Sequence, residues 1–432
     1  MSAQNSLIIF TSASTGLGHI RVMDALRDGL PIGTKSVEVG ITNVNASRLH
    51  LLGSRNRFLL WLTEFIQNHS FAEWIYTIIY TNYLKGHTKE IVSEFEKLAN
   101  DYPNYDKWII VSTHFALAYS IGSSKAEMEE KFKKDIKLCV VVTDDSPQRV
   151  WAVTQADAIF VPSEQTAIKL SKFVDSAKLH TVSFPISPRL TQALNEREYA
   201  NFKRQLDPDL SNRTHIEIPI SGAAVQLSYL ESLIKNLEDS GNFEFTIVGE
   251  KSEFTQNFFD TVGRIQKVQL TLGTSARQTV NIYESLFYQI NKPAIEVTKP
   301  SEQMFKALAT PNERGGLILL LTPPIGRQEY DNLNFLIRHG LAPDDTLQAK
   351  LEELLIDKGI LPFEQKATWY YQASHFRAIR LPKDPKRAAK FIAKLKETGI
   401  LFAMLSFVAE KKFELTPDGV AQIWQYIGKM LQ

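Results

Sequence analysis

The stretch LIIFTSASTGLGHIRVMDALRDGL, residues 7–30, decides the fold class. It begins as a short apolar run, passes through a turn of small residues and continues as a helical pattern from residue 20. Gly16 and Gly18 allow the backbone to pass close to a partner, and the amides at a helix start attract anions such as phosphate. His19 follows in the same turn, and imidazole titrates near neutral pH. The stretch predicts a strand, a turn and a helix with a candidate general base, although the glycines would also suit plain packing of the helix on the strand.

Composition limits the classes of protein to which the chain can belong. With 432 residues the chain is long for one hydrophobic core, so we expect two domains. The net charge of +1 gives no general attraction to nucleic acid. Cys139 is the only cysteine and lies in an apolar run, which predicts a buried structural thiol and excludes disulfides within the chain. Residues 1–6 lack the positive cluster of a secretory signal, so we expect a cytoplasmic protein.

Apolar runs alternate with helical patterns along most of the chain. Their hydrophobicity is continuous rather than alternating, which indicates strands buried on both faces of a parallel sheet. We predict strands at residues 7–10, 36–42, 108–112, 137–143 and 158–162, and a second series at 215–220, 243–248, 294–298 and 316–321. The sequence therefore predicts an α/β protein with two doubly wound, Rossmann-like domains.

The expected domain boundaries follow from changes in composition. Residues 1–190 are expected to form the first domain, and the polar, charged stretch 191–212 a linker. Residues 213–343 are expected to form the second domain, and residues 344–432 a helical extension in which lysine-rich patterns indicate solvated helix faces.

Polar residues follow several of the predicted strands at the points where the strands end. They occupy residues 112–114, 143–145, 162–164 and, in the second series, 221–224. Each segment alone would also suit a turn or a helix cap. Ligands of open parallel sheets bind beyond the carboxyl ends of the strands, so the repeated placement favours an active site in one cleft between the two domains.

Several short motifs follow one another along residues 1–342. They are Gly16-Leu17-Gly18-His19 with Arg21, Ser112-Thr113-His114, Val141-Val142-Thr143-Asp144, Trp151, Asp157, Phe160 to Glu164, Pro185-Ile186, Thr298-Lys299-Pro300, Gly326, Gln328-Glu329 and Asn332. This order resembles the GT-B glycosyltransferases of the family 28 type. That family includes monogalactosyldiacylglycerol synthase, processive diacylglycerol glucosyltransferases and the bacterial lipid-intermediate N-acetylglucosaminyltransferase.

The resemblance implies a fold and an activity. It implies two Rossmann-like domains facing across a cleft, with a last helix near Pro417 to Leu431 that crosses back onto the first domain. It also implies an inverting transfer of a hexosyl group from a UDP-sugar to a hydroxyl of a lipid or lipid-linked, diacylglycerol-like acceptor. The partners are then the UDP-sugar and the lipid, with no nucleic acid. No cofactor beyond the UDP-sugar as co-substrate is expected, and no metal site.

The resemblance also implies roles for individual residues. His19 takes the proton of the acceptor, while Asp144 and His114 place the acceptor or tune His19. The helix that starts near Gly222 would stabilise the diphosphate as it leaves. The residues expected to bind the donor are Gly16, Gly18, Ser221, Gly222, Ala223, Lys299, Gln303, Gln328, Glu329 and Asn332.

Residues 48–85 combine many aromatic and aliphatic residues with basic flanks. Such a segment can dip into a membrane interface, and the resemblance places the membrane-facing part of the acceptor domain here. We therefore expect peripheral contact with an inner membrane leaflet, carried by Arg57, Trp61, Phe65 and Trp74. The alternative is that these residues simply cover the first sheet.

The chain departs from the family pattern at three places in the donor site. Ser301 and Glu302 follow Lys299-Pro300 where the family has glycines. The turn Ser221-Gly222-Ala223-Ala224 holds fewer glycines than the family's diphosphate turn. Lys306 aligns with the acidic residue that holds the ribose, and an ammonium group cannot accept hydrogen bonds from ribose hydroxyls. A second hypothesis therefore stays open, in which the chain is a non-catalytic GT-B-like protein that binds a nucleotide sugar or a partner.

Overall fold

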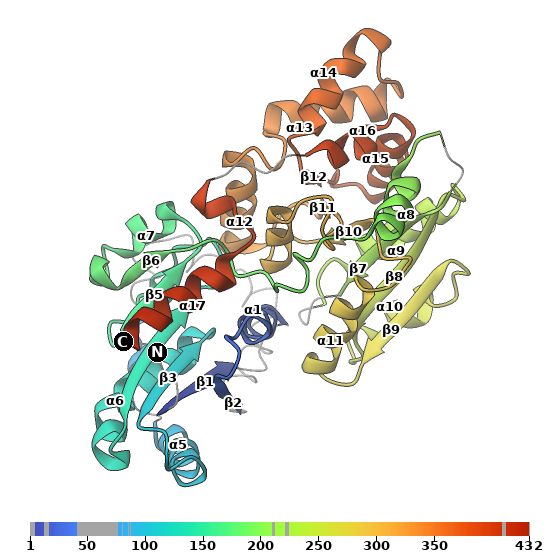
Figure 1. The fold of residues 1–432 in the computed structure, drawn as a ribbon. Coiled ribbons are helices and arrows are strands. Elements are labelled where there is room, and N and C mark those ends of the chain that lie inside the picture. The colour runs from blue at the N-terminus through green and yellow to red at the C-terminus, as the bar shows by residue number, and fades with distance from the viewer. Residues whose placement is uncertain are drawn as a thin grey trace. The chain divides into compact units, whose positions relative to one another are not determined.

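The computed structural model describes residues 5–12, 17–40, 77–79, 81–84, 86, 88–209, 212–220, 224–407 and 412–431. The chain divides into two compact units, and each combines segments that are distant in sequence (Figure 1). The first unit comprises Met1–Pro188, Gly326–Gln328 and Lys412–Gln432. The second comprises Arg189–Ile325 and Glu329–Lys411.

The first unit is built on a six-stranded sheet in the order β2-β1-β3-β4-β5-β6. Its strands are β1 (Ser6–Ser12), β2 (Lys35–Gly40), β3 (Lys107–Ser112), β4 (Asp135–Val141), β5 (Ala158–Val161) and β6 (Leu179–Thr181). All neighbouring pairs in this sheet are parallel. The central strands are almost wholly buried, as continuous hydrophobic runs predict.

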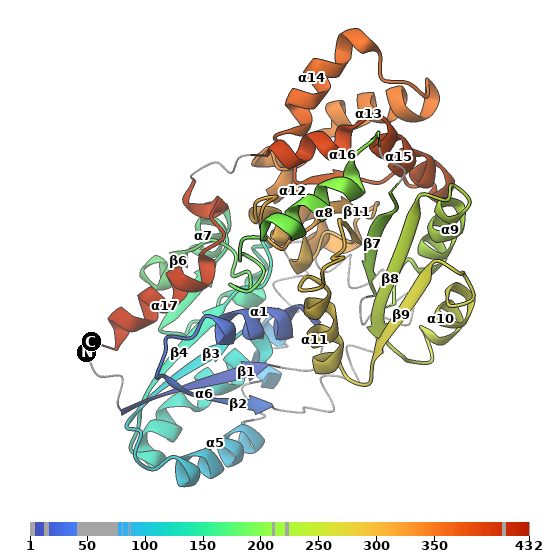
Figure 2. The same ribbon diagram turned by 45° about the vertical axis from the view of Figure 1, so that its right-hand side comes forward.

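Helices cover the first sheet (Figure 2). They are α1 (Leu17–Asp28), α5 (Lys89–Asp101), α6 (Phe115–Phe132), α7 (Glu164–Leu170) and α17 (Gly419–Met430), with short 3-10 turns η2 (Arg149–Trp151), η3 (Ser176–Lys178) and η7 (Phe413–Leu415). The side chain of Trp424 in α17 donates a 2.8 Å hydrogen bond to the carbonyl oxygen of Leu26 and meets the Phe10 ring edge-on. The C-terminal helix thus contributes to the core of the unit that begins at the N-terminus.

The second unit is built on another six-stranded parallel sheet, in the order β12-β11-β10-β7-β8-β9. Its strands are β7 (Thr214–Pro219), β8 (Phe243–Glu250), β9 (Val268–Gly273), β10 (Ile295–Thr298), β11 (Leu317–Leu320) and β12 (Ala378–Arg380). Its helices are α8 (Glu196–Leu206), α9 (Leu227–Glu238), α10 (Gln256–Val262), α11 (Ala276–Leu286), α12 (Gly326–Arg338), α13 (Asp345–Glu352), α14 (Phe363–Ala373), α15 (Pro385–Glu397) and α16 (Ile400–Ala403). The unit also contains the 3-10 helices η4 (Glu302–Leu308) and η6 (Met404–Ser406) and the π-helical segment η5 (Glu353–Asp357). The predicted α/β class with two parallel doubly wound sheets is confirmed.

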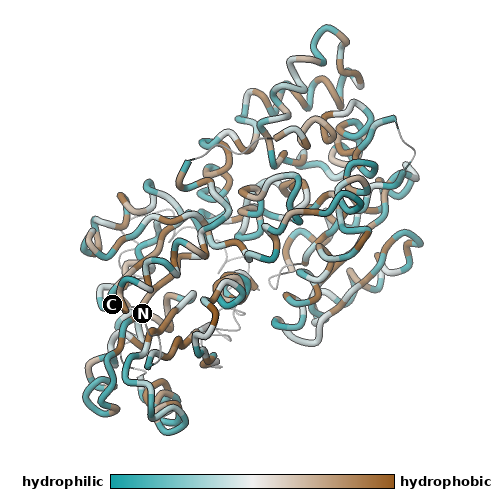
Figure 3. The backbone as a smooth tube through the Cα atoms, in the orientation of Figure 1, coloured by the Kyte–Doolittle hydropathy of each residue, from teal (hydrophilic) through white to brown (hydrophobic). Residues whose placement is uncertain are grey.

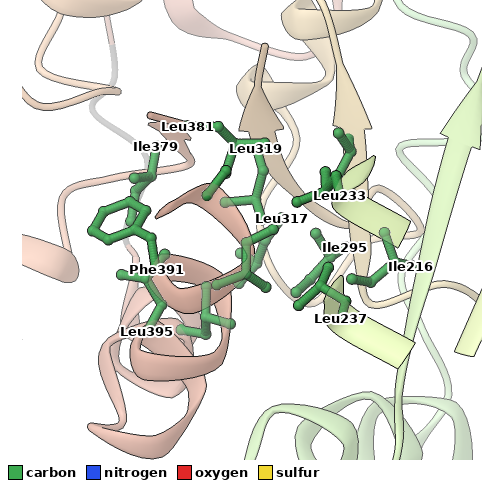
Figure 4. Packing of buried hydrophobic residues seen from close by; sticks show 14 of the residues in the cluster. Ile216, Leu233, Leu237, Ile295, Leu317, Leu319, Ile379, Leu381, Phe391 and Leu395 are labelled. Carbon is green, nitrogen blue, oxygen red and sulfur yellow. The ribbon is translucent and has the colours of Figure 1, made fainter. Parts of the chain in front are cut away.

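The core of the second unit joins helices from distant parts of the sequence. Leu233 and Leu237 of α9 and Phe391 of α15 gather on one face of the sheet, where Leu319 of β11 lies (Figure 4). The hydropathy of the chain follows this arrangement, because hydrophobic segments run along the inner strands and hydrophilic ones along outer turns (Figure 3). Burying apolar side chains from water supplies the main favourable free energy for this packing.

The stretch 191–212, expected as a linker, differs in the structure. Residues Glu196–Leu206 form α8, and Asn195 and Glu198 cap its start by exchanging hydrogen bonds of 2.9 and 3.0 Å between side chains and backbone amides. Phe202 is fully buried against the second unit. The many charges therefore belong to the exposed face of an amphipathic helix.

The expected extension 344–432 also differs. Its first part adds β12 and the helices α13 to α16 to the second unit, while residues from 412 onward join the first. Lys386 and Lys390 of α15 are exposed, as expected, whereas Lys396 is buried along with Ala388, Phe391, Ile392 and Leu395 and donates a hydrogen bond to the carbonyl oxygen of Asn212. Pairing of β12 with β11 completes the sheet, so this region is an integral part of a domain.

Two further sequence predictions concern Cys139 and the membrane. Cys139 is buried in β4, and burial raises the pKa of its thiol to about 12, as suits a structural residue. Among the residues that the structure describes, no helix has the length and apolar character needed to span a bilayer.

We expect the docking of α17 to stabilise the first unit. Replacing Trp424 with Ala removes its hydrogen bond and leaves a cavity, which should cost about 3–5 kcal/mol of unfolding free energy. The exposed Gln425 on the same helix provides the control, because Gln425→Ala should change stability by less than about 0.5 kcal/mol. Urea unfolding, followed by hydrogen exchange in the first unit, measures both variants. Equal stability of Trp424→Ala and wild type would show that α17 does not dock there.

Lys292 makes the stability of the second unit depend on pH. Burial, and then the nearby charges of Arg377 and Arg314, lower the pKa of Lys292 from 10.5 to about 7. Between pH 7 and 10 the unfolded chain therefore binds the proton more strongly, so this lysine alone makes stability rise with pH by roughly 1.4 kcal/mol per unit. Lys292→Met should lose this contribution, whereas Lys350→Met, at an exposed site, should keep it. Unfolding curves at several pH values test this, and an unchanged slope in Lys292→Met would contradict it.

Candidate functional site

The candidate site of the first unit lies where four neighbouring strands end. His19 is in the first turn of α1, which follows β1, and His114 caps α6 directly after β3. Thr143 and Asp144 follow β4, and Ser163 caps α7 after β5. Because β1, β3, β4 and β5 are adjacent and parallel, their carboxyl ends lie along one edge of the sheet. The topology therefore brings His19, His114 and Asp144 to the same edge, as the sequence predicts.

Two hydrogen bonds fix the position of His19. Its Nδ1 atom lies 2.7 Å from the carbonyl oxygen of Thr113, and the Thr113 hydroxyl donates to the carbonyl oxygen of His19 at 2.9 Å. A carbonyl oxygen can only accept, so Nδ1 must carry the hydrogen of this bond. In the neutral ring, Nε2 is then the basic nitrogen. The structure thus holds His19 in the tautomer that a general base needs.

Aromatic rings form one wall of the site. The His19 and His114 rings meet edge-on with their centroids 4.8 Å apart, and the Trp151 ring lies 6.3 Å from His19. His114 stacks on Phe115 at 5.1 Å and is 8% exposed. Such an apolar wall restricts the rotation of both imidazoles.

The two adjacent aspartates of the site have different surroundings. Asp145 accepts hydrogen bonds from the hydroxyls of Ser163 and Thr166, so it joins the β4 and β5 loops. Asp144 is 4% exposed and accepts a hydrogen bond from the hydroxyl of Thr143 at 3.3 Å. Asp145 therefore connects the loops that follow β4 and β5, whereas the carboxylate of Asp144 contacts the hydroxyl of Thr143.

The polar cluster of the second unit lies beyond the ends of β10 and β11. The ammonium group of Lys299 is 2.8 Å from the carboxylate of Glu329, whose other oxygen accepts from the backbone amide of Ile325 at 2.7 Å. Glu329 is in the first turn of α12, where the helix dipole favours a negative charge. This arrangement places a lysine with a side chain 25% exposed at the start of α12.

The remaining predicted donor residues of this cluster are buried. Gln303 accepts a 2.6 Å hydrogen bond from the hydroxyl of Thr298, and Asn332 donates one of 3.2 Å to the carbonyl oxygen of Pro300. Both bonds tie the loop after β10 to its surroundings. Gln303 and Asn332 therefore shape the loop that contains Lys299.

Lys306 lies inside the second unit and forms a buried ion pair. Its ammonium group contacts the carboxylate of Glu296, and that carboxylate also accepts a 2.8 Å hydrogen bond from the hydroxyl of Tyr283. The rings of Tyr283 and Phe287 lie 4.5 and 4.6 Å from the ammonium nitrogen. Lys306 and Glu296 are 5% and 1% exposed. Lys306 therefore neutralises the carboxylate of Glu296 on β10.

The other predicted residues differ in how far the structure places them. Gly18 is placed by the backbone, in the first turn of α1. Gln328 is in the first turn of α12, within the segment grouped with the first unit, and its side-chain amide donates a hydrogen bond to the carboxylate of Asp144. Outside the described residues lie Gly16, Arg57, Trp61, Phe65, Trp74, Ser221, Gly222 and Ala223. No metal-binding group of His, Cys, Asp or Glu side chains occurs among the residues that are described.

The backbone just before α9 has an unusual conformation. Ala224 and Gln226 have φ angles of 50° and 60°, in the left-handed region that glycine adopts freely. Ala224 is the last residue of the predicted turn 221–224, and Gln226 directly precedes α9. Both positions are therefore occupied by residues that adopt this conformation less readily than glycine does.

The sequence analysis assigned no individual role to three residues that contribute to these sites. Thr113 and Thr143 were visible as polar residues at strand ends, but their contacts with His19 depend on how separate loops pack. Glu296 lies within a predicted strand, where a single charged residue in an apolar run indicates a buried partner.

Comparisons with known proteins identify the fold. No protein-family model matches the sequence, and no curated protein matches it. Among solved structures, a candidate UDP-N-acetylglucosamine 2-epimerase from Listeria monocytogenes is 11% identical with a TM-score of 0.53, covering 100% of this chain and 97% of that chain. MnaA from S. aureus, solved with UDP, is 9% identical with a TM-score of 0.50, covering 99% and 97%.

At these identities the likeness establishes the fold alone. The likeness extends over both units, and each unit has a parallel six-stranded sheet. The resemblance to lipid glycosyltransferases rests on sequence motifs and stays a prediction. The fold of this chain is GT-B.

Proposed function

We propose that this protein is an inverting glycosyltransferase that uses a UDP-sugar, with His19 as the general base. The observation that carries the proposal is the hydrogen bond from His19 Nδ1 to the carbonyl oxygen of Thr113, because it makes Nε2 the basic atom. Asp144 and His114 lie at the same sheet edge and are the groups proposed to place the acceptor or tune His19.

The proposed reaction needs one base and no covalent intermediate. His19 Nε2 takes the proton of an acceptor hydroxyl while the hydroxyl oxygen forms a bond to the anomeric carbon. The bond between that carbon and the diphosphate oxygen breaks, and UDP leaves with the electron pair. Attack from the face opposite to the leaving group inverts the anomeric configuration.

The donor proposal draws on the second unit and on its structural relatives. The MnaA structure contains UDP, and the Listeria protein is named for a UDP-sugar. In this chain Lys299 lies at the carboxyl edge of β10, and its partly exposed ammonium group, paired with Glu329, is the cation that we propose contacts the anionic donor. We assign donor binding to this edge, together with the turn 221–223.

The acceptor proposal is a lipid or a lipid-linked sugar. It is supported by the order of sequence motifs and by the aromatic, basic composition of residues 48–85, which suits peripheral contact with a membrane leaflet. A hydroxyl of a diacylglycerol-like molecule is the chemical group on which His19 would act.

The ion pair of Lys306 favours a second candidate function. A buried lysine with an internal partner cannot accept hydrogen bonds from ribose hydroxyls, so donor binding must differ from the family pattern. In this second candidate the protein binds a nucleotide sugar or another partner without turnover. Binding and turnover must therefore be measured separately.

The first test is a pair of assays on the full chain. We expect saturable calorimetric binding of one sugar among UDP-glucose, UDP-galactose and UDP-N-acetylglucosamine, and release of UDP with diacylglycerol vesicles. His19→Gln should lower kcat by about 100-fold or more while binding of the donor persists, because only the proton acceptor is lost. His375→Gln, at an exposed position on the second unit, is the control and should leave both values unchanged.

Each other result selects a different conclusion. A wild-type kcat in His19→Gln would overturn the assignment of the base. Donor binding without turnover in the wild type would support the non-catalytic candidate. Absence of binding to UDP and to all three sugars would contradict both candidates as nucleotide-sugar proteins.

The Lys306 ion pair gives a stability prediction of its own. Lys306→Met leaves the Glu296 carboxylate buried without a cation, which should cost about 3–5 kcal/mol of unfolding free energy. The double variant with Glu296→Gln should cost clearly less than the sum of the single variants. The exposed pair of Lys235 and Glu231 is the control, since Lys235→Met should cost less than about 1 kcal/mol. Urea unfolding measures the cycle, and additive effects would exclude a direct interaction.

A further inference from the structure

Thr143 lies between His19 and Asp144. Its hydroxyl oxygen is 3.3 Å from His19 Nδ1 and 3.3 Å from the nearer carboxylate oxygen of Asp144. The side chain is 2% exposed, so water cannot readily replace either contact. Both distances are slightly longer than the usual range for hydrogen bonds. Hydrogen bonds at catalytic sites are often long before substrate binds.

The direction of each hydrogen bond follows from the hydrogens that are present. Nδ1 of His19 carries a hydrogen, because its 2.7 Å partner is the Thr113 carbonyl oxygen. The Thr143 hydroxyl has only one hydrogen and cannot donate it to an Nδ1 that is already protonated. An ionised carboxylate is a pure acceptor, so the hydroxyl hydrogen points to Asp144 and the oxygen lone pairs face the imidazole.

We propose that Thr143 is a positioning residue that transmits the negative charge of Asp144 to His19. When His19 takes a proton on Nε2, the ring becomes positively charged. The Thr143 dipole, oriented by Asp144, then stabilises that charge, and no bond in this chain of contacts breaks. The inference rests on the proposed function for its role in turnover, whereas the electrostatic coupling exists without substrate.

Other titratable or charged groups near His19 are His114, Asp145 and Arg21, and their relation to the His19 ring differs from that of Asp144. His114 faces it at 4.8 Å between ring centroids, and its protonation would oppose that of His19. Asp145 lies next to Asp144 but accepts hydrogen bonds from Ser163 and Thr166. Arg21 is two residues further along α1. Among the contacts of the described residues given above, it is Asp144 that is joined to His19 through a shared hydroxyl, so removal of that hydroxyl tests this connection.

The test is an NMR titration of the histidine rings in the full chain, without substrate. Thr143→Val keeps the shape of the side chain and removes the hydroxyl. We expect the midpoint of the His19 titration to fall by about one pH unit in Thr143→Val, which is a tenfold loss of proton affinity. Thr143→Ser, which restores the hydroxyl, should titrate as the wild type does. In an Asp144→Asn background, Thr143→Val should cause little further change.

The outcomes separate this inference from the proposed function. An unchanged midpoint in Thr143→Val, or equal shifts in Thr143→Val and Thr143→Ser, would overturn the relay. If UDP is released by the wild type, the acidic limb of its kcat/KM profile should move with the NMR midpoint in Thr143→Val. If no UDP-sugar is turned over while the midpoint still falls, the relay stands and the transferase proposal fails.

Discussion

Parallel pairing of the strands is the constraint on which the sites of both units depend. When every strand of a sheet runs in one direction, each return requires a crossover, and all carboxyl ends meet at one edge. Loops that are far apart in sequence then lie next to one another along the carboxyl edge of the sheet. His19, Thr113 and Asp144 come from three such loops, and the same rule collects Lys299 and Glu329 in the second unit.

The sequence predicted what depends on local pattern and missed what depends on tertiary contacts. The predicted strands correspond to β1 to β5, β7, β8, β10 and β11. Apart from β2, which is an edge strand with exposed Lys35 and Glu38, these are continuous apolar runs in the interior of a sheet. The missed strands β6, β9 and β12 are all at sheet edges, where strands are short or half exposed. The polar loops of the site were predictable from strand ends, whereas the partners of Thr143 and Lys306 require knowledge of which side chains meet.

Because Lys306 and Glu296 form a buried ion pair, the residue type tolerated at one position depends on the residue at the other. A charge in the interior is tolerated only with its counterpart, since desolvation of either ion alone is costly. Lys306→Glu alone would therefore bring two buried carboxylates into contact, and their negative charges would repel each other. An acidic residue at position 306 would therefore require a compensating change at Glu296.

The contact of Trp424 with Leu26 joins residues 398 positions apart. The ribosome synthesises the chain from its N-terminus, so β1 and α1 leave the ribosome long before α17 has been made. During translation, the carbonyl oxygen of Leu26 and the ring of Phe10 therefore lack their contacts with Trp424 until the second unit has been synthesised. The first unit therefore completes its core last, although its strands are made first.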